Sequence, residues 1–503
     1  SNPDEGVCAI CLSAATQKCS GCQSVHYCSK DHQKQHWKEH KNHCVPARVR
    51  EDEKLGRYLE ASREIRAGDI VMKEKPLITG PAQVTPPVCL GCYKLLEEGK
   101  TVSCDKCGWP FCSQECTTKD EHVPECYYTQ KRGDKVNITT FGMPHPNYQC
   151  ITALRCLYQR DHNPKLWEKL QGLQSHCEDR RGTDKWNNDK KMVADFIWQF
   201  FKLDGVFNED EIMKCCGILQ INGHEVPLLE PEYLAVFDRI SMVEHNCKAN
   251  CNKSFTSDGE IILCAGTAIP INSHISVCYT DPLWGTEARR HHLADSKFFE
   301  CSCERCSDVT EYNTMYSAVK CKKKSTRNLD NKSWICNCCK DAVSDAIIQQ
   351  LLQDIGRELS VMPKGDADAC ERFISHCMGY LHPSHYYMTD VSLALAQMIG
   401  QDSELGLPSV TDDRLLLKTQ LCRKIADLLE ILAPAETRLR GTLLFELHAA
   451  VADNGRRKSL REGPIVMLGY VQVIQTFLYI VQYDRTNLVL KISAHICAKF
   501  TYL

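Results

Sequence analysis

Three cysteines in a C-x-C-x2-C cluster constrain the fold of this chain more than any other feature. Cys301, Cys303 and Cys306 lack one ligand for the four-coordinate tetrahedral site that structural zinc prefers. The fourth ligand must come from elsewhere in the fold, and Cys247 is the natural candidate. If Cys247 joins the three later thiols, two segments more than fifty residues apart are held together, and a pocket closes between them.

A second set of metal-type residues fills the first fifty positions. The spacings C-x2-C, C-x2-C, C-x3-H and H-x3-C supply eight ligands, enough for two zinc ions. The last two spacings place both ligands of a pair on one face of a helix. Disulfides and free thiols are disfavoured by so complete a pattern, and His36 is not expected to bind because the set is already full. The predicted ligands are Cys8, Cys11, Cys19, Cys22, Cys28, His32, His40 and Cys44.

The same eight-ligand arrangement recurs later in the chain. Each of these short segments has little apolar core of its own, so we expect it to fold only with metal. Every predicted zinc ion has four protein ligands, and a zinc hydrolase is disfavoured because it needs an open position for water. The second set consists of Cys89, Cys92, Cys104, Cys107, Cys112, Cys116, His122 and Cys126.

Composition narrows the class of protein. A chain of 503 residues with 43% hydrophobic residues predicts two to four globular domains. The net charge of -3 gives no support for direct nucleic-acid binding beyond a small basic excess in the first fifty residues. The 33 cysteines, at metal-type spacing and without a signal-like apolar segment at the start, favour an intracellular protein of the cytoplasm and/or nucleus. The uncharged run from Pro464 to Tyr483 contains three glutamines and predicts a buried helix rather than a membrane span.

Several local patterns predict further elements. Alternating apolar residues from Lys54 to Ile78, with a turn at 66–69, indicate a β-hairpin. Helical patterns follow at 151–158, 166–173, 192–201 and 209–216, and the chain is helical from Ala342 onward. Cys321 and the cysteines at 336–339 lack one thiol for a paired C-x2-C site, because Lys324 stands in its place. We therefore expect free buried thiols there rather than a further zinc site.

The stretch Glu244-His245-Asn246-Cys247, the triplet Tyr279-Thr280-Asp281 and the tail from Phe299 to Cys306 together resemble a known family. They are similar to the motifs of the SMYD (SET and MYND domain) protein-lysine methyltransferases. The second finger lies where that family carries its MYND finger, so the chain resembles a divergent member with an additional N-terminal MYND finger. The resemblance implies that the first and third ligand pairs of each finger share one metal, and that five zinc ions are bound in all.

The resemblance also implies an α+β architecture. A β-rich SET domain contains the inserted zinc fingers and a helical insert, and an all-α TPR-like C-terminal domain follows it. The expected boundaries are a first MYND finger at 1–46, the N-terminal part of SET at 47–86, the second finger at 87–128, the helical insert at 129–230, the SET core at 231–283, the post-SET zinc cluster at 284–310 and the TPR-like domain at 311–503.

The family's chemistry is methyl transfer from S-adenosylmethionine to lysine. The resemblance assigns the catalytic hydroxyl to Tyr279, which we also expect to contact the cofactor. A tyrosine hydroxyl at this place can orient the amine, and aromatic side chains favour the cationic centres. The other expected cofactor-binding residues are Gly56, Arg57, His245, Asn246 and Phe299.

Three departures from the family pattern touch the expected active site. Tyr58 stands where a second glycine would lie open to the cofactor. Glu244 replaces an asparagine, and Lys297 replaces a tyrosine of the lysine channel. Two functions are therefore weighed: an S-adenosylmethionine-dependent protein-lysine N-methyltransferase acting on histone or non-histone proteins, and a catalytically weak or inactive SET scaffold that acts as a protein-interaction adaptor.

The expected partners follow from the same resemblance. A protein or peptide substrate is implied, with proline-rich peptides at the MYND fingers and Hsp90-type tails at the helical domain. Neither direct nucleic-acid binding nor a membrane association is expected.

Overall fold

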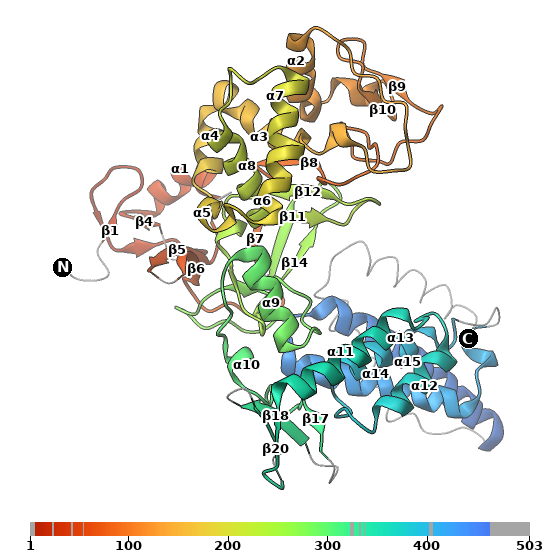
Figure 1. The fold of residues 1–503 in the computed structure, drawn as a ribbon. Coiled ribbons are helices and arrows are strands. Elements are labelled where there is room, and N and C mark those ends of the chain that lie inside the picture. Colours follow the sequence, from red (N-terminus) through yellow and green to blue (C-terminus); the bar gives the residue numbers. More distant parts are fainter. Residues whose placement is uncertain are drawn as a thin grey trace.

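The computed structural model describes residues 6–22, 25–41, 44–53, 55–321, 326–330, 333–336, 338–401 and 406–462. The uncharged run at 464–483, expected to form a buried helix, lies outside these residues. Figure 1 shows the first finger in red at one side, a yellow helical layer above the green strands, and the blue C-terminal helices below them.

The first finger leads directly into a β-hairpin. It comprises β1 (Gly6–Val7), β2 (Ala14–Ala15), β3 (Gln17–Lys18), β4 (His26–Tyr27) and α1 (Lys30–His40). The hairpin that follows pairs β5 (Ala47–Asp52) with β6 (Gly56–Ala61), so that Ala47 lies opposite Ala61 and Asp52 opposite Gly56.

The hairpin expected across the turn at 66–69 is wrong, although the turn itself forms. Asp69 donates its N–H to the Arg66 carbonyl at 3.1 Å, as in a tight turn. The next strand, β7 (Ile70–Glu74), pairs with β15 (Ile261–Ala265) instead of β6. The reason lies at the turn, where Gly68 N–H donates to the Ala265 carbonyl at 2.7 Å and carries the chain onto the distant strand.

Two three-stranded antiparallel sheets form the middle of the molecule. One has the order β14 (Cys251–Phe255), β15, β7, and the other has the order β11 (Gly223–Val226), β12 (Tyr233–Val236), β8 (Ile78–Pro81). Ile261, Leu263 and Ala265 alternate inward along β15 and are at most 2% exposed, as a strand with one buried face requires. The sheets therefore share a core built from segments on both sides of the second finger and the helical insert.

A short parallel pair brings two distant loops side by side. β13 (Glu244–His245) pairs with β16 (Ser276–Val277), so that Glu244 faces Ser276 and His245 faces Val277. Asn250 strengthens this arrangement, because its amide nitrogen donates to the His274 carbonyl at 2.7 Å and its amide oxygen accepts from Ser276 N–H at 2.9 Å. The segment that leads to Tyr279 is thereby fixed beside His245.

The second finger and the helical insert share one core. Asn208 and Glu211 form a reciprocal capping box that starts the last helix of the insert, which ends directly at strand β11. The elements are β9 (Val102–Ser103), β10 (Pro110–Phe111), α2 (Val123–Arg132), α3 (Ile151–His162), α4 (Pro164–Gln171), α5 (Cys177–Arg180), α6 (Asp184–Asp189), α7 (Asp195–Phe201) and α8 (Glu209–Asn222).

The C-terminal part begins with a sheet, which corrects the expectation of an all-helical segment from residue 311. A four-stranded antiparallel sheet precedes the helices, in the order β17 (Val319–Lys320), β18 (Thr326–Asp330), β19 (Ser333–Cys336), β20 (Ala342–Ser344). Its four strands pair locally, one after the next along the chain. Helix α9 (Thr286–Lys297) and the short α10 (Glu304–Ser307) connect this sheet to the strands of the central sheets.

Five helices complete the described chain and pack as consecutive neighbours, with α12 on α13, α13 on α14 and α14 on α15. Stacked helices of this kind bury faces that a single pair could not cover. No helix in the described part of the chain combines the length and the apolar character needed to cross a membrane. The helices are α11 (Asp345–Val361), α12 (Ala367–Cys377), α13 (Tyr386–Met398), α14 (Asp412–Leu432) and α15 (Thr437–Glu462).

A buried arginine fastens the second finger to the helical insert. Arg155 donates to both carboxylate oxygens of Glu125, at 3.0 and 2.7 Å, and to the Leu90 and Thr79 carbonyls at 2.8 and 2.9 Å. Arg155 and Glu125 are 2% and 0% exposed. Neither charge reaches water, so each depends on the other.

We predict that Arg155→Leu lowers the free energy of unfolding by about 3–5 kcal/mol, because it leaves the Glu125 carboxylate buried without its partner. Urea unfolding followed by circular dichroism measures the change. The control is Lys100→Met, which breaks the exposed ion pair with Glu97 and should leave the unfolding curve unchanged. Equal stability of the two variants would show that the Arg155 pair contributes nothing.

Candidate functional site

The predicted metal ligands converge in five groups of four. Within each group all ligand atoms lie within 4.8 Å of one another, and the sulfur and imidazole donors fit tetrahedral zinc. The ligand atoms group as the first and third, and the second and fourth, pairs of each finger. The groups are Cys8, Cys11, Cys28 and His32; Cys19, Cys22, His40 and Cys44; Cys89, Cys92, Cys112 and Cys116; Cys104, Cys107, His122 and Cys126; and Cys247, Cys301, Cys303 and Cys306.

Two histidines of the fingers have different roles. His36 lies outside the ligand sets, and its Nδ1 is 2.9 Å from the Tyr27 hydroxyl. His122 lies inside one, with Nε2 3.3 Å from Cys107 Sγ and Nδ1 3.0 Å from Glu125 Oε1. A carboxylate on the second ring nitrogen fixes the orientation of a metal-binding imidazole. The Arg155–Glu125 pair therefore reaches the metal group of the second finger.

The fifth group joins the loop after β13 to the segment that follows α9. Cys247 Sγ lies 3.9 Å from Cys301 Sγ and 3.5 Å from Cys306 Sγ, and all three residues are at most 6% exposed. The loop after β13 and the segment after α9 are thus held at one point, as the C-x-C-x2-C spacing predicts.

Buried arginines surround this group. Arg289 is 0% exposed, and its guanidinium lies 3.7 Å from Cys306 Sγ. Arg305, also 0% exposed, donates to the Pro282 carbonyl at 2.8 Å and to the Leu432 carbonyl, at the end of α14, at 3.4 Å. Glu311 accepts from both arginines, at 3.3 and 2.8 Å. Four thiolates on one zinc ion carry net negative charge, which the two guanidinium groups offset.

His245 links the metal group to the strand that precedes Tyr279. Burial lowers its pKa to about 4, so the imidazole is neutral near pH 7. The Tyr279 N–H donates to Nδ1 at 3.0 Å, which leaves the ring proton on Nε2. Nε2 lies 3.2 Å from Cys247 Sγ and donates to that sulfur. One neutral ring therefore fixes the metal ligand and the Tyr279 backbone together.

Tyr279 lies beside the other predicted aromatic residue of the site. Ring centroids are 5.2 Å apart for His245 and Tyr279, and 5.9 Å apart for His245 and Phe299. The Tyr279 hydroxyl donates to the Val243 carbonyl, and burial raises its pKa above the usual value, so the phenol stays protonated. Asn246, next in the loop, accepts the Lys248 N–H on its side-chain oxygen at 2.9 Å and closes a turn.

The strand that carries Gly56 and Arg57 borders the same region. Gly56 has φ of 67°, and no atom lies within 4 Å of the place where a Cβ would be. A left-handed backbone with open space beside it fits the close approach of a ligand. The Arg57 guanidinium points elsewhere and donates to the Gly172 carbonyl at the end of α4.

Two of the departing residues, Tyr58 and Glu244, form one unit through a third residue. The Tyr58 ring stacks on the His274 ring with centroids 4.4 Å apart. His274 Nδ1 lies 3.0 and 3.1 Å from the two carboxylate oxygens of Glu244. The Glu244 carboxylate therefore has a hydrogen-bond partner whose ring stacks on Tyr58.

Lys297, the third departure, caps a helix. Its ammonium donates to the Gln220 and Ile221 carbonyls, at 3.2 and 2.7 Å, at the C-terminal end of α8. It lies 5.9 Å from the centroid of the Tyr279 ring. Burial, together with the charge of Lys253, lowers its pKa to about 8. The amine is thus held beside the tyrosine by backbone carbonyls.

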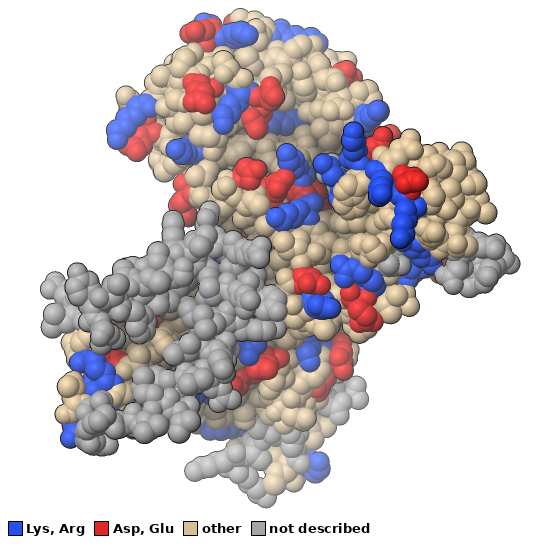
Figure 2. Space-filling view, turned by 180° about the vertical axis from the view of Figure 1, so that it is seen from behind, with Lys and Arg blue, Asp and Glu red and all other residues tan. Residues whose placement is uncertain are grey.

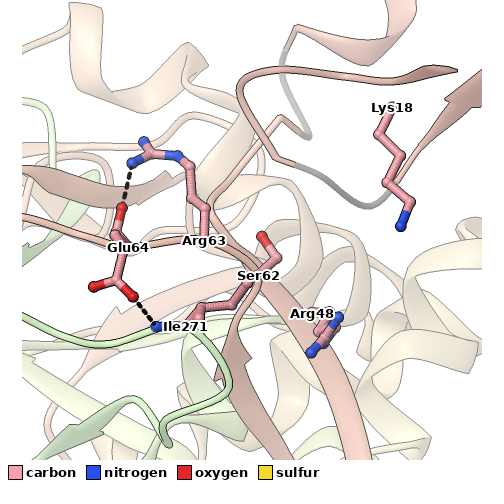
Figure 3. A pocket seen from close by; sticks show the side chains of 6 residues that line it. All are labelled: Lys18, Arg48, Ser62, Arg63, Glu64 and Ile271. Atoms are coloured by element: carbon pink, nitrogen blue, oxygen red, sulfur yellow. Dashed lines mark hydrogen bonds between the residues drawn. The ribbon is translucent and has the colours of Figure 1, made fainter. Parts of the chain in front are cut away.

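Two cavities lie near these residues without including the predicted cofactor contacts. A cavity of about 330 Å³, shown in Figure 3, is lined by Lys18 of the first finger, by Arg48 of β5, by residues 62–64 after β6 and by Ile271. There Glu64 accepts the Ile271 N–H at 3.0 Å and Arg63 donates to the Glu64 carbonyl at 2.8 Å. A larger cavity of about 600 Å³ lies beside Cys306, between α9, Trp334 of β19 and Tyr386 of α13.

Charge on the face shown in Figure 2 is mixed in sign over most of its area. A short run of Lys and Arg gathers at the edge where the first finger lies. The exposed residues of helix α1 and its end include Lys30, Lys34, Lys38 and Lys41. These lysines contribute to the small basic excess of the first fifty residues.

Sequence patterns missed the residues that support the site. His274 belongs to no motif, and its role depends on a stacking partner more than two hundred residues away in the chain. No sequence motif indicates the buried roles of Arg289, Arg305 and Glu311, because charged residues are normally exposed. The closeness of Arg305 to a cysteine cluster was the one available signal.

Comparison with known proteins gives one family and several relatives. The MYND finger family matches residues 8–44. SET domain-containing protein SmydA-8 of Drosophila melanogaster is 26% identical in isoform B over 353 residues, which cover 67% of this chain and 73% of that protein. Its isoform A is 26% identical over 305 residues, covering 58% of this chain and 64% of that protein.

Histone-lysine N-methyltransferase SMYD3 of Homo sapiens is 24% identical over 269 residues, which cover 50% of this chain and 59% of that enzyme. The chain thus matches less than two thirds of the length of two of these three proteins. The finger match and these relatives agree with the resemblance read from the cysteine, histidine and tyrosine motifs.

We predict that Cys247→Ser removes about one zinc ion per chain, because it deletes a ligand that no other described residue of the group replaces. Elemental analysis of purified protein by plasma mass spectrometry measures the loss. Cys251→Ser is the matched control, since Cys251 is a buried thiol four residues away that belongs to none of the five groups. Unchanged zinc in Cys247→Ser would exclude Cys247 as a ligand.

Proposed function

We propose that this chain is an S-adenosylmethionine-dependent protein-lysine N-methyltransferase, because it belongs to the SMYD family of SET and MYND domain proteins. Its substrates would be histone or non-histone proteins. The observation that carries the proposal is the two-sided hydrogen bonding of His245, which joins the metal group at Cys247 to the backbone of Tyr279.

The residues at this place suit the chemistry of methyl transfer. S-adenosylmethionine supplies a methyl group on a sulfonium, and the protein must align it with the amine and exclude water. The Tyr279 hydroxyl donates a hydrogen bond to the Val243 carbonyl, so its oxygen lone pairs remain to accept a hydrogen bond from an incoming amine. The raised pKa of Tyr279 keeps the phenol protonated and neutral near pH 7.

The cofactor fits the described residues at two points. Open space beside Gly56 accommodates the close approach of a ligand, and the neutral His245 with Phe299 offers an aromatic wall. Glu244 accepts hydrogen bonds but cannot donate them, so it suits the α-ammonium of the cofactor rather than its α-carboxylate. With the His274 contact already made, Glu244 is held in place for that role.

A second function, an adaptor with little or no catalysis, is favoured by Lys297. Its amine lies near the Tyr279 ring where the family has a tyrosine, and its positive charge opposes a cationic lysine there. An adaptor would use the fingers and the helices. We propose proline-rich peptides as ligands of the MYND fingers and Hsp90-type tails as ligands of the α11–α15 array, on family resemblance.

Calorimetric titration with S-adenosylmethionine separates the two functions. If the chain is an enzyme, it binds S-adenosylmethionine. If zinc-replete protein shows no detectable binding of S-adenosylmethionine, only the adaptor function remains. We further predict that Tyr279→Phe lowers kcat about 100-fold while the Kd for the cofactor is unchanged, because only the amine-orienting hydroxyl is lost.

The matched control is Tyr233→Phe, which removes a hydroxyl from a ring stacked on Tyr93 at 4.5 Å, in the core of the neighbouring sheet. It should retain kcat. Full activity of Tyr279→Phe, or equal losses in both variants, would contradict the role given to Tyr279. Transfer of labelled methyl groups to histones and to a lysine-rich peptide provides the readout.

A further inference from the structure

Three cysteines outside the five metal groups meet at the end of the sheet β17–β20. Cys321 directly follows β17 and Cys336 ends β19, and their sulfur atoms are 3.4 Å apart. Cys339 lies in the turn after Cys336, and its N–H donates to Cys336 Sγ at 3.4 Å. A sulfur separation of 3.4 Å is far longer than the roughly 2 Å of a disulfide.

The thiol of Cys339 also faces the other two. Its side chain contacts the Cys336 thiol and lies near Cys321. Its neighbour Cys338 is exposed, whereas Cys321 and Cys336 are buried. Three thiols therefore converge while a fourth, adjacent in sequence, points to solvent.

The turn after Cys336 has a specific geometry. Cys336 N–H donates to the Asp341 carbonyl at 2.9 Å, and Lys340 N–H donates to the Cys336 carbonyl at 3.1 Å. Lys340 adopts φ of 60°, a left-handed conformation that is costly for a residue with a Cβ. A lysine has no intrinsic preference for this conformation that would offset its steric cost.

The same turn occurs at two C-x2-C pairs of the second finger. Cys89 N–H donates to the Lys94 carbonyl at 2.8 Å, Tyr93 N–H donates to the Cys89 carbonyl at 2.6 Å, and Tyr93 has φ of 64°. At the other pair, Cys104 and Gly108 make the corresponding bonds at 2.9 and 2.8 Å, and Gly108 has φ of 81°.

The first finger repeats it once more. Cys8 N–H donates to the Ser13 carbonyl at 2.8 Å, Leu12 N–H donates to the Cys8 carbonyl at 3.0 Å, and Leu12 has φ of 60°. In these three cases the two cysteines of the pair belong to one metal group. The turn presents both sulfur atoms on one side, as a shared ion requires.

We propose that Cys321, Cys336 and Cys339 bind a further zinc ion. The proposal departs from the expectation of free buried thiols, which rested on the missing fourth cysteine in the sequence. Thiolate sulfur is a preferred ligand of zinc, and the described residues here supply three of the four ligands that a tetrahedral site takes. The ion at this site is therefore held less tightly than an ion with four protein ligands.

The site has a structural consequence. Strand β19 carries Trp334, which lines the 600 Å³ cavity and donates its ring N–H to the Asp345 carboxylate at the start of α11 at 2.8 Å. Zinc at the end of β19 anchors the strand that forms this wall. Metal occupancy thus controls the order of one side of the cavity between α9 and the C-terminal helices.

The test compares zinc content, by plasma mass spectrometry, in the full-length chain and in three variants. Cys339→Ala is expected to contain about one zinc ion fewer per chain than the parent protein. Cys339→His is expected to keep the ion, because imidazole replaces thiolate as a ligand, as His32 does in the first finger. Cys338→Ala, which removes the adjacent exposed thiol, is the matched control and should keep it too.

A chromogenic chelator gives a second readout on the unmodified protein. Release of about one equivalent of zinc ahead of the remainder, with this early phase missing in Cys339→Ala, supports the site. Zinc content in Cys339→Ala equal to that of the parent, or an equal loss in Cys338→Ala, overturns it. Neither measurement depends on methyl transfer, so its outcome is independent of the proposed enzyme function.

Discussion

The Cys247 thiol, which converges with three later cysteine thiols, is the constraint on which the arrangement of this protein depends. It comes from the loop after β13, and its three companions come from the segment after α9, so its sulfur ties together two stretches that are 54 residues apart. Around it, Arg305 reaches the end of α14 through the Leu432 carbonyl. The metal group is thus also the joint between the SET strands and the C-terminal helices.

The buried charged side chains near the cysteine groups follow one physical rule. An ionised side chain out of water needs an opposite charge and filled hydrogen bonds. Arg289 and Arg305 meet Glu311 and the negative sulfur ligands, and Arg155 meets Glu125 beside the second finger. In both places a guanidinium joins a metal group to helices from another part of the chain. Charge compensation therefore has the same geometric role as packing.

Two residues expected to depart from the family pattern are linked to each other through a third. Tyr58 stacks on His274, and His274 bonds Glu244, so loss of His274 would leave both of the others without this partner. Lys297 is likewise engaged, by the carbonyls at the end of α8. The expected active site is thus a set of mutually supported residues.

Sequence by itself determined the ligand sets and the fold class. Metal coordination requires fixed residue types at short, regular spacings, and such spacings can be recognised directly in an amino-acid sequence. It also indicated the turn at 66–69 and the helices of the insert. Only the tertiary structure decided which strand β7 joins, what His274 contacts, and that Cys321 meets Cys336. Those contacts join segments that sequence spacing does not relate, and they are selected by burial and charge compensation in the folded chain rather than by local preference.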